Sequence, residues 1–171
     1  MKGWLVIGVS MVLCIPAVAA ETFKGIVNMG GSILETPCAI AMESLDQTIV
    51  LDTVPLASLK QWGEGTRQSF AINIINCRLT SSTGTVWANF SLTFEGPAER
   101  NGFSVFGQAT GIALRIDDAQ GQPILPGEPL WAGALLRGDR KLEYGLRVVS
   151  NNSAYTPGDF QSTLRFKLDY D

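Results

Sequence analysis

Histidine is absent from this sequence of 171 residues. Because histidine is the commonest general base near neutral pH and a frequent zinc ligand, its absence excludes Ser-His-Asp and Cys-His catalysis and histidine-bound zinc. Charged residues are scarce, at 17% of the chain, and its 13 lysines and arginines form no basic block. Such a chain is a poor partner for nucleic acid or an anionic membrane surface. We therefore expect a protein that is not an enzyme and needs no cofactor.

Long apolar runs are confined to the beginning of the chain. Lys2 precedes a nearly unbroken apolar stretch over residues 4–15, and small residues follow at Ala17, Ala19 and Ala20. A positive start, a short apolar run and small residues at the cleavage point are typical of a signal peptide. The run is too short to span a membrane. We expect residues 1–20 to be cleaved, after Ala19 or Ala20, and the mature chain to be exported.

Cysteine is also rare, with three residues in the chain. Cleavage of the signal peptide removes Cys14 and leaves Cys38 and Cys77. Export into an oxidising compartment favours a disulfide between these two. Two thiols without histidine make a poor metal site. The sequence therefore predicts a Cys38–Cys77 disulfide and no metal centre.

Amphipathic helices are missing, and apolar residues instead recur at every second position between clusters of Gly, Pro, Ser and Asn. This period is typical of half-buried β-strands. We expect strands at four alternating sets, which are Phe70-Ile72-Ile74, Phe90-Leu92-Phe94, Ile112-Leu114-Ile116 and Leu142-Tyr144-Leu146-Val148. Short strands are expected at residues 33–34 and 48–51, and a helical turn within residues 54–62. This spacing predicts one all-β domain, an immunoglobulin-like sandwich or, as the alternative, a small barrel.

The two ends of the expected mature chain alternate more regularly than ordinary termini. Near the C-terminus, Gly158 precedes an apolar set separated by polar residues, interrupted only by Ser162. The members of this set are Phe160, Leu164, Phe166, Leu168 and Tyr170. Near the N-terminus, one parity contains Val27, Met29, Gly31 and Ile33, and the other is mostly polar. On this pattern alone, the N-terminal segment is either a separate extended arm or part of its own sheet.

Several short motifs occur in an order that resembles a known family. They are Thr36-Pro37-Cys38, Ile75-Asn76-Cys77, the Gly111-Ile112-Ala113-Leu114 strand, Gly158 at the fourteenth position from the end, and penultimate Tyr170. Gly31 lies seven residues before Cys38. Over essentially the whole mature sequence, the chain resembles the pilin subunits of chaperone–usher fimbriae of Gram-negative bacteria.

The resemblance implies an immunoglobulin-like sandwich that lacks its last strand, completed by a strand from another protein. It implies an N-terminal donor strand over residues 21–33, with Val27, Met29, Gly31 and Ile33 in a neighbour's groove, and a pilin domain over residues 34–171. The strand from Gly158 through Phe160 to Tyr170 would line this chain's own groove. The implied partners are a periplasmic chaperone, an outer-membrane usher and neighbouring pilins, with any host receptor contacted only indirectly. The implied location is a cell-surface fimbria that contributes to adhesion.

Some features leave alternatives open. Phe23-Lys24-Gly25 also resembles the family's donor pattern, so the donor register could centre on Gly25 instead of Gly31, and Glu35 breaks the alternation. A fibre-terminating subunit, or a sugar-binding tip adhesin using Trp62, Trp87 or Trp131, would be alternative functions. We expect these tryptophans to pack in the core or groove. We expect Asp117 and Asp118 to be solvated turn residues.

Overall fold

The computed structural model describes residues 26–33 and 35–171. The expected signal peptide, the first residues of the expected arm and Leu34 lie outside the described residues. The chain divides into two compact units, Met1–Ile33 and Leu34–Asp171. Within the described residues, no helix is both long enough and apolar enough to cross a membrane.

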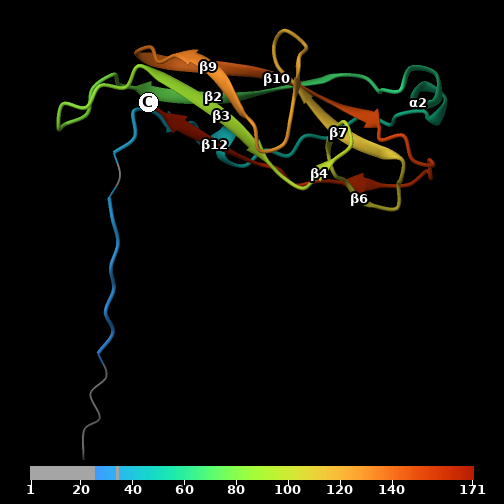
Figure 1. Ribbon diagram of the computed structural model, residues 1–171, viewed down its shortest axis with the longest axis horizontal. Coiled ribbons are helices and arrows are strands. Elements are labelled where there is room, and N and C mark those ends of the chain that lie inside the picture. Colours follow the sequence, from blue (N-terminus) through green and yellow to red (C-terminus); the bar gives the residue numbers. More distant parts are fainter. Residues whose placement is uncertain (1–25, 34) are drawn as a thin grey trace, which may run out of the picture. The chain divides into compact units, whose positions relative to one another are not determined.

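The larger unit contains one extended antiparallel sheet, built around the long strands β2 and β10 (Figure 1). β10 lies between β2 and β7 and pairs with both, from Gly138 opposite Cys77 to Ser150 opposite Ile112. The sheet has the order β1 (Ala39–Ile40), β2 (Gln68–Cys77), β10 (Gly138–Ser150), β7 (Ile112–Asp117), β5 (Gly102–Phe103) and β4 (Ala98–Glu99), with β8 (Pro123–Ile124) also on β7. Each edge of β10 therefore has a strand partner over part of its length, β2 along residues 138–146 and β7 along residues 145–150.

A second sheet has three strands and packs against the first. Its order is β12 (Arg165–Tyr170), β3 (Asn89–Glu95) and β9 (Pro129–Ala134). The short strands β11 (Phe160–Gln161) and β6 (Phe106–Gly107) form a separate pair. Phe94 of β3 meets Tyr144 of β10 edge to face, with ring centroids 5.1 Å apart. Because this contact joins the two sheets, the predicted sandwich is confirmed, and the small barrel is not formed.

Alternation along the strands produces the core. Side chains on one face of β2, β10, β7 and β3 are buried, and residues between them face outward. The most deeply buried apolar residues are Ile72, Ile74, Phe90, Leu92, Phe103, Ile116 and Val148. These include members of all four alternating sets that the sequence placed in strands.

Two short helices interrupt the first part of the unit. α1 (Met42–Leu45) follows β1, and α2 (Leu56–Trp62) lies within the segment where a helical turn was expected. Pro55 precedes α2, and Gly63 ends it in the left-handed conformation at φ 74°. Proline at the start and glycine just past the end are the residues that helix termini favour.

Two short strands predicted from the sequence are not found. Residues 48–51 are extended but belong to no strand. The reason lies on β2, whose edge is occupied by other groups of the same segment: Ala41 N–H donates to Asn73 O, Asn73 N–H donates to Ser44 Oγ, and Gln47 Nε2 donates to Ala71 O. Ile33 is likewise outside any strand, and Leu34 lies outside the described residues.

Candidate binding edge on the last strand

The last strand of the chain, β12, is an edge strand. It pairs antiparallel with β3 from Arg165 opposite Glu95 to Tyr170 opposite Phe90. Among the described residues, no strand pairs with its other side. The main-chain N–H and C=O groups along that side are therefore available to a further strand. We call this free side of β12, with its apolar side chains, the open edge.

The apolar face of the open edge is only half-buried. Its members are Phe160, Leu164, Phe166, Leu168 and Tyr170. The strand beside it is fully buried, since Phe90, Leu92 and Phe94 of β3 are at most 3% exposed. Phe166 lies 6.5 Å from Phe94 and Tyr170 lies 6.4 Å from Phe90, centroid to centroid. One side of the Phe166 ring and one side of the Tyr170 ring are thus packed. This burial raises the pKa of the Tyr170 hydroxyl above its usual value.

Ser162 interrupts the apolar alternation where the chain passes from β11 to β12. Its Oγ donates a hydrogen bond to the carbonyl oxygen of Ser104 at 2.8 Å. Leu164, which follows, occupies the space that a side chain on Gly96 would need, because a Cβ there would lie 2.6 Å from Leu164 Cδ2. The break is therefore a bonded turn between two strand segments that pair with different partners, β6 and β3.

Gly158 occupies the position from which the last strand begins. A Cβ at this residue would lie 2.5 Å from Gln108 Cβ, and its φ is 155°. Only glycine allows the two backbones to approach so closely in this conformation. The need for glycine at this position is thus steric.

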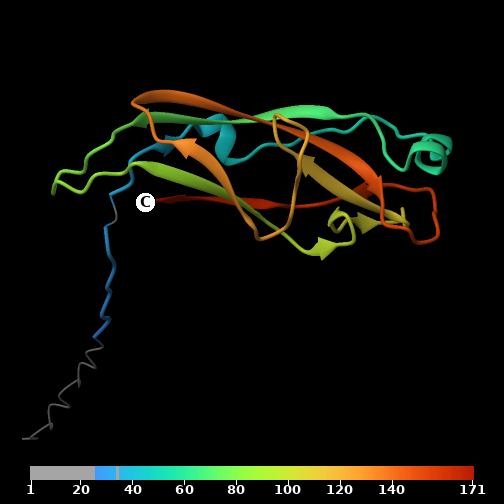
Figure 2. The same cartoon turned by 45° about the horizontal axis from the view of Figure 1, so that its top comes forward.

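A second set of half-buried apolar residues lies in the extended segment between α1 and α2, residues 48–54 (Figure 2, teal). Ile49, Leu51 and Val54 pack against the same core as the open edge. Within the described part of the chain, no backbone–backbone hydrogen bond involves residues 48–54. The larger unit therefore contains two stretches, β12 and residues 48–54, that combine half-buried apolar side chains with unpaired main chain.

The described part of the N-terminal unit, residues 26–33, is extended and belongs to no strand. Val27, Met29 and Ile33 are 82%, 92% and 102% exposed. A Cβ on Gly30 or on Gly31 would have no atom of the described residues within 4 Å. The expected apolar parity therefore has no packing partner among the described residues of its own unit. Insertion of this segment into a neighbouring subunit stays a prediction, and so does a donor register centred on Gly31 or on Gly25. Gly25 lies outside the described residues.

Glu35, which breaks the alternation after the arm, has a local role. Its carboxylate accepts hydrogen bonds from Ser82 Oγ at 2.8 Å and from Ser82 N–H at 3.0 Å. These hydrogen bonds, the hydroxyl first, lower the pKa of Glu35 below its usual value. The polar residue thus ties the start of the larger unit to the loop after β2.

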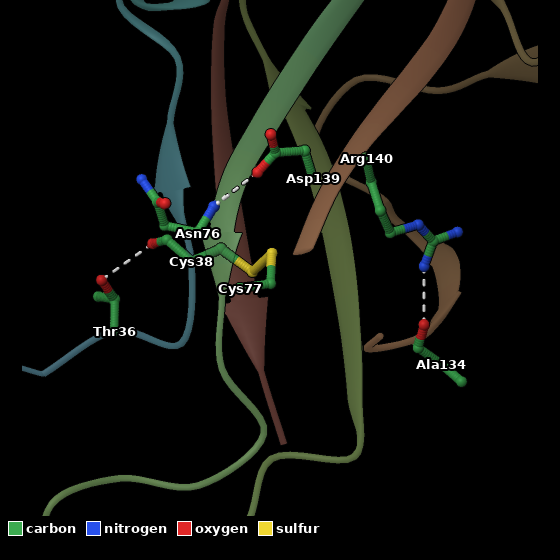
Figure 3. The surroundings of a disulfide bond; sticks show 7 residues. All are labelled: Thr36, Cys38, Asn76, Cys77, Ala134, Asp139 and Arg140. Carbon is green, nitrogen blue, oxygen red and sulfur yellow. Dashed lines mark hydrogen bonds between the residues drawn. A yellow bond between two sulfur atoms is a disulfide. The ribbon is translucent and has the colours of Figure 1, made fainter. Parts of the chain in front are cut away.

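The predicted disulfide between Cys38 and Cys77 is present (Figure 3). It joins the residue before β1 to the last residue of β2, next to the pair Ala39–Ile75. Asn76 N–H donates to Asp139 Oδ1 at 2.9 Å, which ties the same corner to the start of β10. With a sequence separation of 39, a cross-link of this length contributes about 4 kcal/mol in a chain-entropy treatment.

Two expectations about side chains were wrong. Asp117 is 0% exposed and contacts Arg115 and Arg147, whereas only Asp118 serves as the expected turn residue by accepting from the N–H groups of Gln120 and Gln122. Asp117 is buried because β7 continues through it. Charged neighbours cover the face of β7 on which Asp117 lies. No sequence pattern distinguishes a strand face that is covered in this way from one that is exposed to solvent.

The tryptophans also differ from expectation. Trp62 and Trp131 are 71% and 62% exposed, while Trp87 is half-buried against the core as expected. Trp62 ends α2, and Trp131 lies on the outward parity of β9, opposite Ser91. Figure 1 shows α2 and β9 in separate regions of the larger unit. Across the described residues, no three Cys, Asp or Glu side chains are grouped as metal ligands would be.

Comparison with known proteins agrees with this architecture. The family model described as Fimbrial protein matches residues 27–171. The PRS fimbrial minor pilin protein of Escherichia coli is 29% identical over 87% of this chain and 78% of its own length, and the major MR/P fimbria protein of Proteus mirabilis is 32% identical over 97% and 95%. The crystal structure of the P pilus rod subunit superposes with a TM-score of 0.70 at 26% identity, covering 80% of this chain and all of that one.

A family match over most of the chain assigns it: the protein belongs to the fimbrial protein family. Its fold is the incomplete immunoglobulin-like sandwich of the pilins. The strand that such a sandwich lacks would lie beside the last strand, where β12 has its open edge.

Proposed function

We propose that this chain is a structural subunit of a Gram-negative surface fimbria, and that its open edge accepts the N-terminal arm of the next subunit. The observation that carries the proposal is that one chain contains both a free strand edge and an apolar segment that could pair with such an edge. β12 has a free edge with a half-buried apolar face, and residues 26–33 are an extended apolar segment with no partner in their own unit. A strand added to a sheet edge gains main-chain hydrogen bonds, and its alternate side chains enter pockets.

The arm has the right chemistry for this role. Val27, Met29 and Ile33 share one parity, so an added strand would direct all three toward the apolar face of β12. Burying these three side chains at roughly 1.5–3 kcal/mol each, together with the half-buried apolar residues of β12 that they cover, contributes on the order of 10 kcal/mol before ordering costs. That is comparable to the whole net stability of an ordinary domain. A subunit with an empty open edge is thus marginal, and an occupied one is stable.

The same logic supports the assembly partners. An exposed strand edge beside an apolar face promotes aggregation. A periplasmic chaperone that covers the edge, and an outer-membrane usher where the arm of the next subunit replaces it, would prevent this during export. Neighbouring pilins are the final partners in the fibre, through which the subunit contributes to adhesion.

Gly31→Arg tests the proposal. Gly31 has the parity of Val27 and Met29, so arginine there would place a charge against the neighbour's apolar face. Overpacking alone costs about 1–3 kcal/mol, and a buried unpaired charge adds several more. We expect Gly31→Arg to block polymerisation but to leave chaperone co-purification unchanged.

Gly30→Arg is the matched control, since it adds the same side chain to the opposite parity one residue earlier. We expect it to polymerise, as measured by fibre electron microscopy and by mixing with wild-type subunit. Loss of chaperone binding in Gly31→Arg would instead place the arm in its own domain. Normal polymerisation of Gly31→Arg would show that Gly31 does not enter the neighbour's site.

A further inference from the structure

Four charged side chains form a closed ring on the outer face of β7 and β10. Arg115 Nε lies 2.9 Å from Asp117 Oδ1, and Arg115 Nη2 lies 2.8 Å from Glu64 Oε2. Arg147 Nη1 lies 2.8 Å from Glu64 Oε1. Arg147 Nε lies 2.8 Å from Asp117 Oδ2, as a close ion pair outside hydrogen-bond alignment. Two arginines and two carboxylates thus neutralise one another.

The ring is needed where it lies. Arg115 and Arg147 are directly opposite each other in the β7–β10 ladder, and like charges in that position are destabilising. Asp117 is fully buried, and a buried charge is costly unless it is paired. Glu64 belongs to neither strand: it follows α2, and its side chain is 37% exposed. It therefore connects the segment after α2 to the sheet through charge.

The segment held by Glu64 is also fixed by main-chain bonds. Gly65 N–H donates to Val148 O, and Ser150 N–H donates to Gly63 O, both at 2.8 Å. Gly65 in turn is packed against Val54, since a Cβ on Gly65 would lie 2.9 Å from Val54 Cγ2. Val54 is the last apolar member of the extended segment 48–54. The ring is therefore linked by packing to one of the two stretches with unpaired main chain.

Residues 48–54 have few other constraints. At their beginning, the side chain of Gln47 is held by Ala71 O. At their end, Leu51, Asp52, Thr53 and Val54 line a small void of about 10 Å³ with Thr66, Gln68 and Val148. Between these points the segment has no backbone–backbone hydrogen bond to any described residue. Its position therefore depends on the packing of Ile49, Leu51 and Val54 against the core and on what holds its two ends.

We propose that Glu64 is a positioning residue for strand acceptance: through Gly65 and Val54, the ion-pair ring helps to hold residues 48–54, which pack on the same core as the apolar residues of β12, as the second border of the site that receives the arm. The inference rests on the proposed function, because the site is defined by the arm it accepts. Glu64→Gln removes the carboxylate shared by two arginines and leaves the ring with a net positive charge. Residues 48–54 then lose their fixed position, and a bound arm is released faster.

The experiment uses the oxidised mature chain with a fluorescent peptide of the arm sequence, residues 21–33. Release of the bound peptide is followed after addition of excess unlabelled peptide, and amide hydrogen exchange is recorded for residues 48–54, β3 and β12. We expect Glu64→Gln to release the peptide roughly fivefold faster, the effect of losing about 1 kcal/mol. Exchange should accelerate at residues 48–54 but not in β3 or β12.

Glu143→Gln is the matched control, since it breaks the exposed Lys141–Glu143 pair on β10 outside the ring. We expect release within twofold of wild type for this variant. Glu64→Asp keeps the charge with shorter reach, should be intermediate, and carries the test if Glu64→Gln does not fold. Wild-type release and exchange in both Glu64 variants would overturn the inference. A wild-type chain that takes up no peptide would overturn the proposed function, and limited proteolysis within residues 48–54, compared between Glu64→Gln and wild type, would still decide the role of Glu64.

Discussion

β10 and β12 have the same sequence signature and different environments. Each alternates apolar and polar residues along most of its length, and each packs against the shared core. Leu142, Tyr144, Leu146 and Val148 of β10 are at most 8% exposed, whereas the apolar residues of β12 are half-buried. The difference lies in the edges: β10 has strand partners on both of its sides, β2 along residues 138–146 and β7 along residues 145–150, and among the described residues β12 is paired on one side only.

The comparison shows that a strand is buried by its neighbours as much as by its own composition. A β-strand covers its apolar side chains partly with the opposite sheet and partly with the side chains of adjacent strands. β12 has the opposite sheet and β3, but nothing on its free side. Five experiments test this contrast between β10 and β12.

The largest expected effect is that of filling the open edge. Arm peptide should stabilise the mature chain by a large part of the roughly 10 kcal/mol estimated from apolar burial. We expect the purified chain alone to aggregate or to melt without cooperativity, and the peptide-bound chain to melt cooperatively. Circular dichroism melts with sizing chromatography measure this, and a Gly31→Arg peptide is the control. A monomer that melts cooperatively without peptide would contradict an incomplete fold.

The disulfide makes the next largest contribution, on the paired side of the sandwich. Replacing both Cys38 and Cys77 by serine should lower the free energy of unfolding of the peptide-bound chain by about 4 kcal/mol. Denaturant unfolding of the double variant beside the wild type measures the change. Because β12 and the open edge are remote from this bond in the pairing order, peptide release should change little. Equal losses in stability and in peptide affinity would show that the two sides are coupled.

Matched leucines separate the two strands directly. Leu146→Ala in β10 removes a side chain that is 7% exposed and should lower the free energy of unfolding of the peptide-bound chain by about 3 kcal/mol. Leu168→Ala in β12 removes a half-buried side chain and should weaken arm-peptide binding about tenfold, or about 1.4 kcal/mol. Unfolding curves and peptide titrations of both variants test this. An identical profile for the two would remove the distinction between the strands.

The smallest effect on the free energy of unfolding is expected near neutral pH, because the tyrosine hydroxyls stay protonated there. The effect grows as the pH becomes alkaline. Burial, with a lesser contribution from the Asp118 charge, raises the pKa of Tyr144 to about 12. Because the folded pKa exceeds the unfolded one, the folded chain holds its proton longer, so stability is full below pH ~10 and is lost as pH rises toward 12. The Tyr144 contribution should reach about 3 kcal/mol, and denaturant unfolding at alkaline pH should show a smaller loss in Tyr144→Phe than in the wild type.

Tyr170 provides the matched comparison on the open side. Its pKa is also raised by burial. Peptide binding should raise it further by covering the ring, but should leave Tyr144 unchanged. Ultraviolet titration of the two Tyr→Phe variants, with and without peptide, resolves the two groups. A Tyr170 titration unaffected by peptide would mean that the arm does not reach the end of β12.

Much of the architecture was predictable because it is local. Period-two alternation located the strands that contain Ile72, Leu92, Leu114 and Leu146. The helical turn expected within residues 54–62 was found as α2. Cys38 and Cys77 were predictable as a pair because the expected cleavage of the signal peptide would leave no other cysteine. In each case the deciding interaction lies within a few residues or follows from composition.

Other features depended on contacts between distant residues. Residues 48–51 alternate like a strand, but Ser44 and Gln47 already occupy the β2 edge. Asp117 lies where a strand pattern runs into a turn. Its charge is buried because Arg147 and Glu64, from other segments, complete the ion-pair ring that offsets the cost of burying it. Trp62 and Trp131 are large and apolar but have no neighbours to cover them. Propensity and periodicity describe a residue's own backbone, and they do not show which residue from a distant part of the sequence will contact it.

The sequence by itself determined that this is an all-β chain with a Cys38–Cys77 disulfide, because alternation and the positions of the cysteines are properties of the chain alone. Only the tertiary structure decided that, of the two alternating strands, β10 has partners on both sides and β12 has a free edge. That decision depends on strand order, and strand order is set by the packing of all strands together. The open edge of β12 exists because no described segment of its own chain lies beside it.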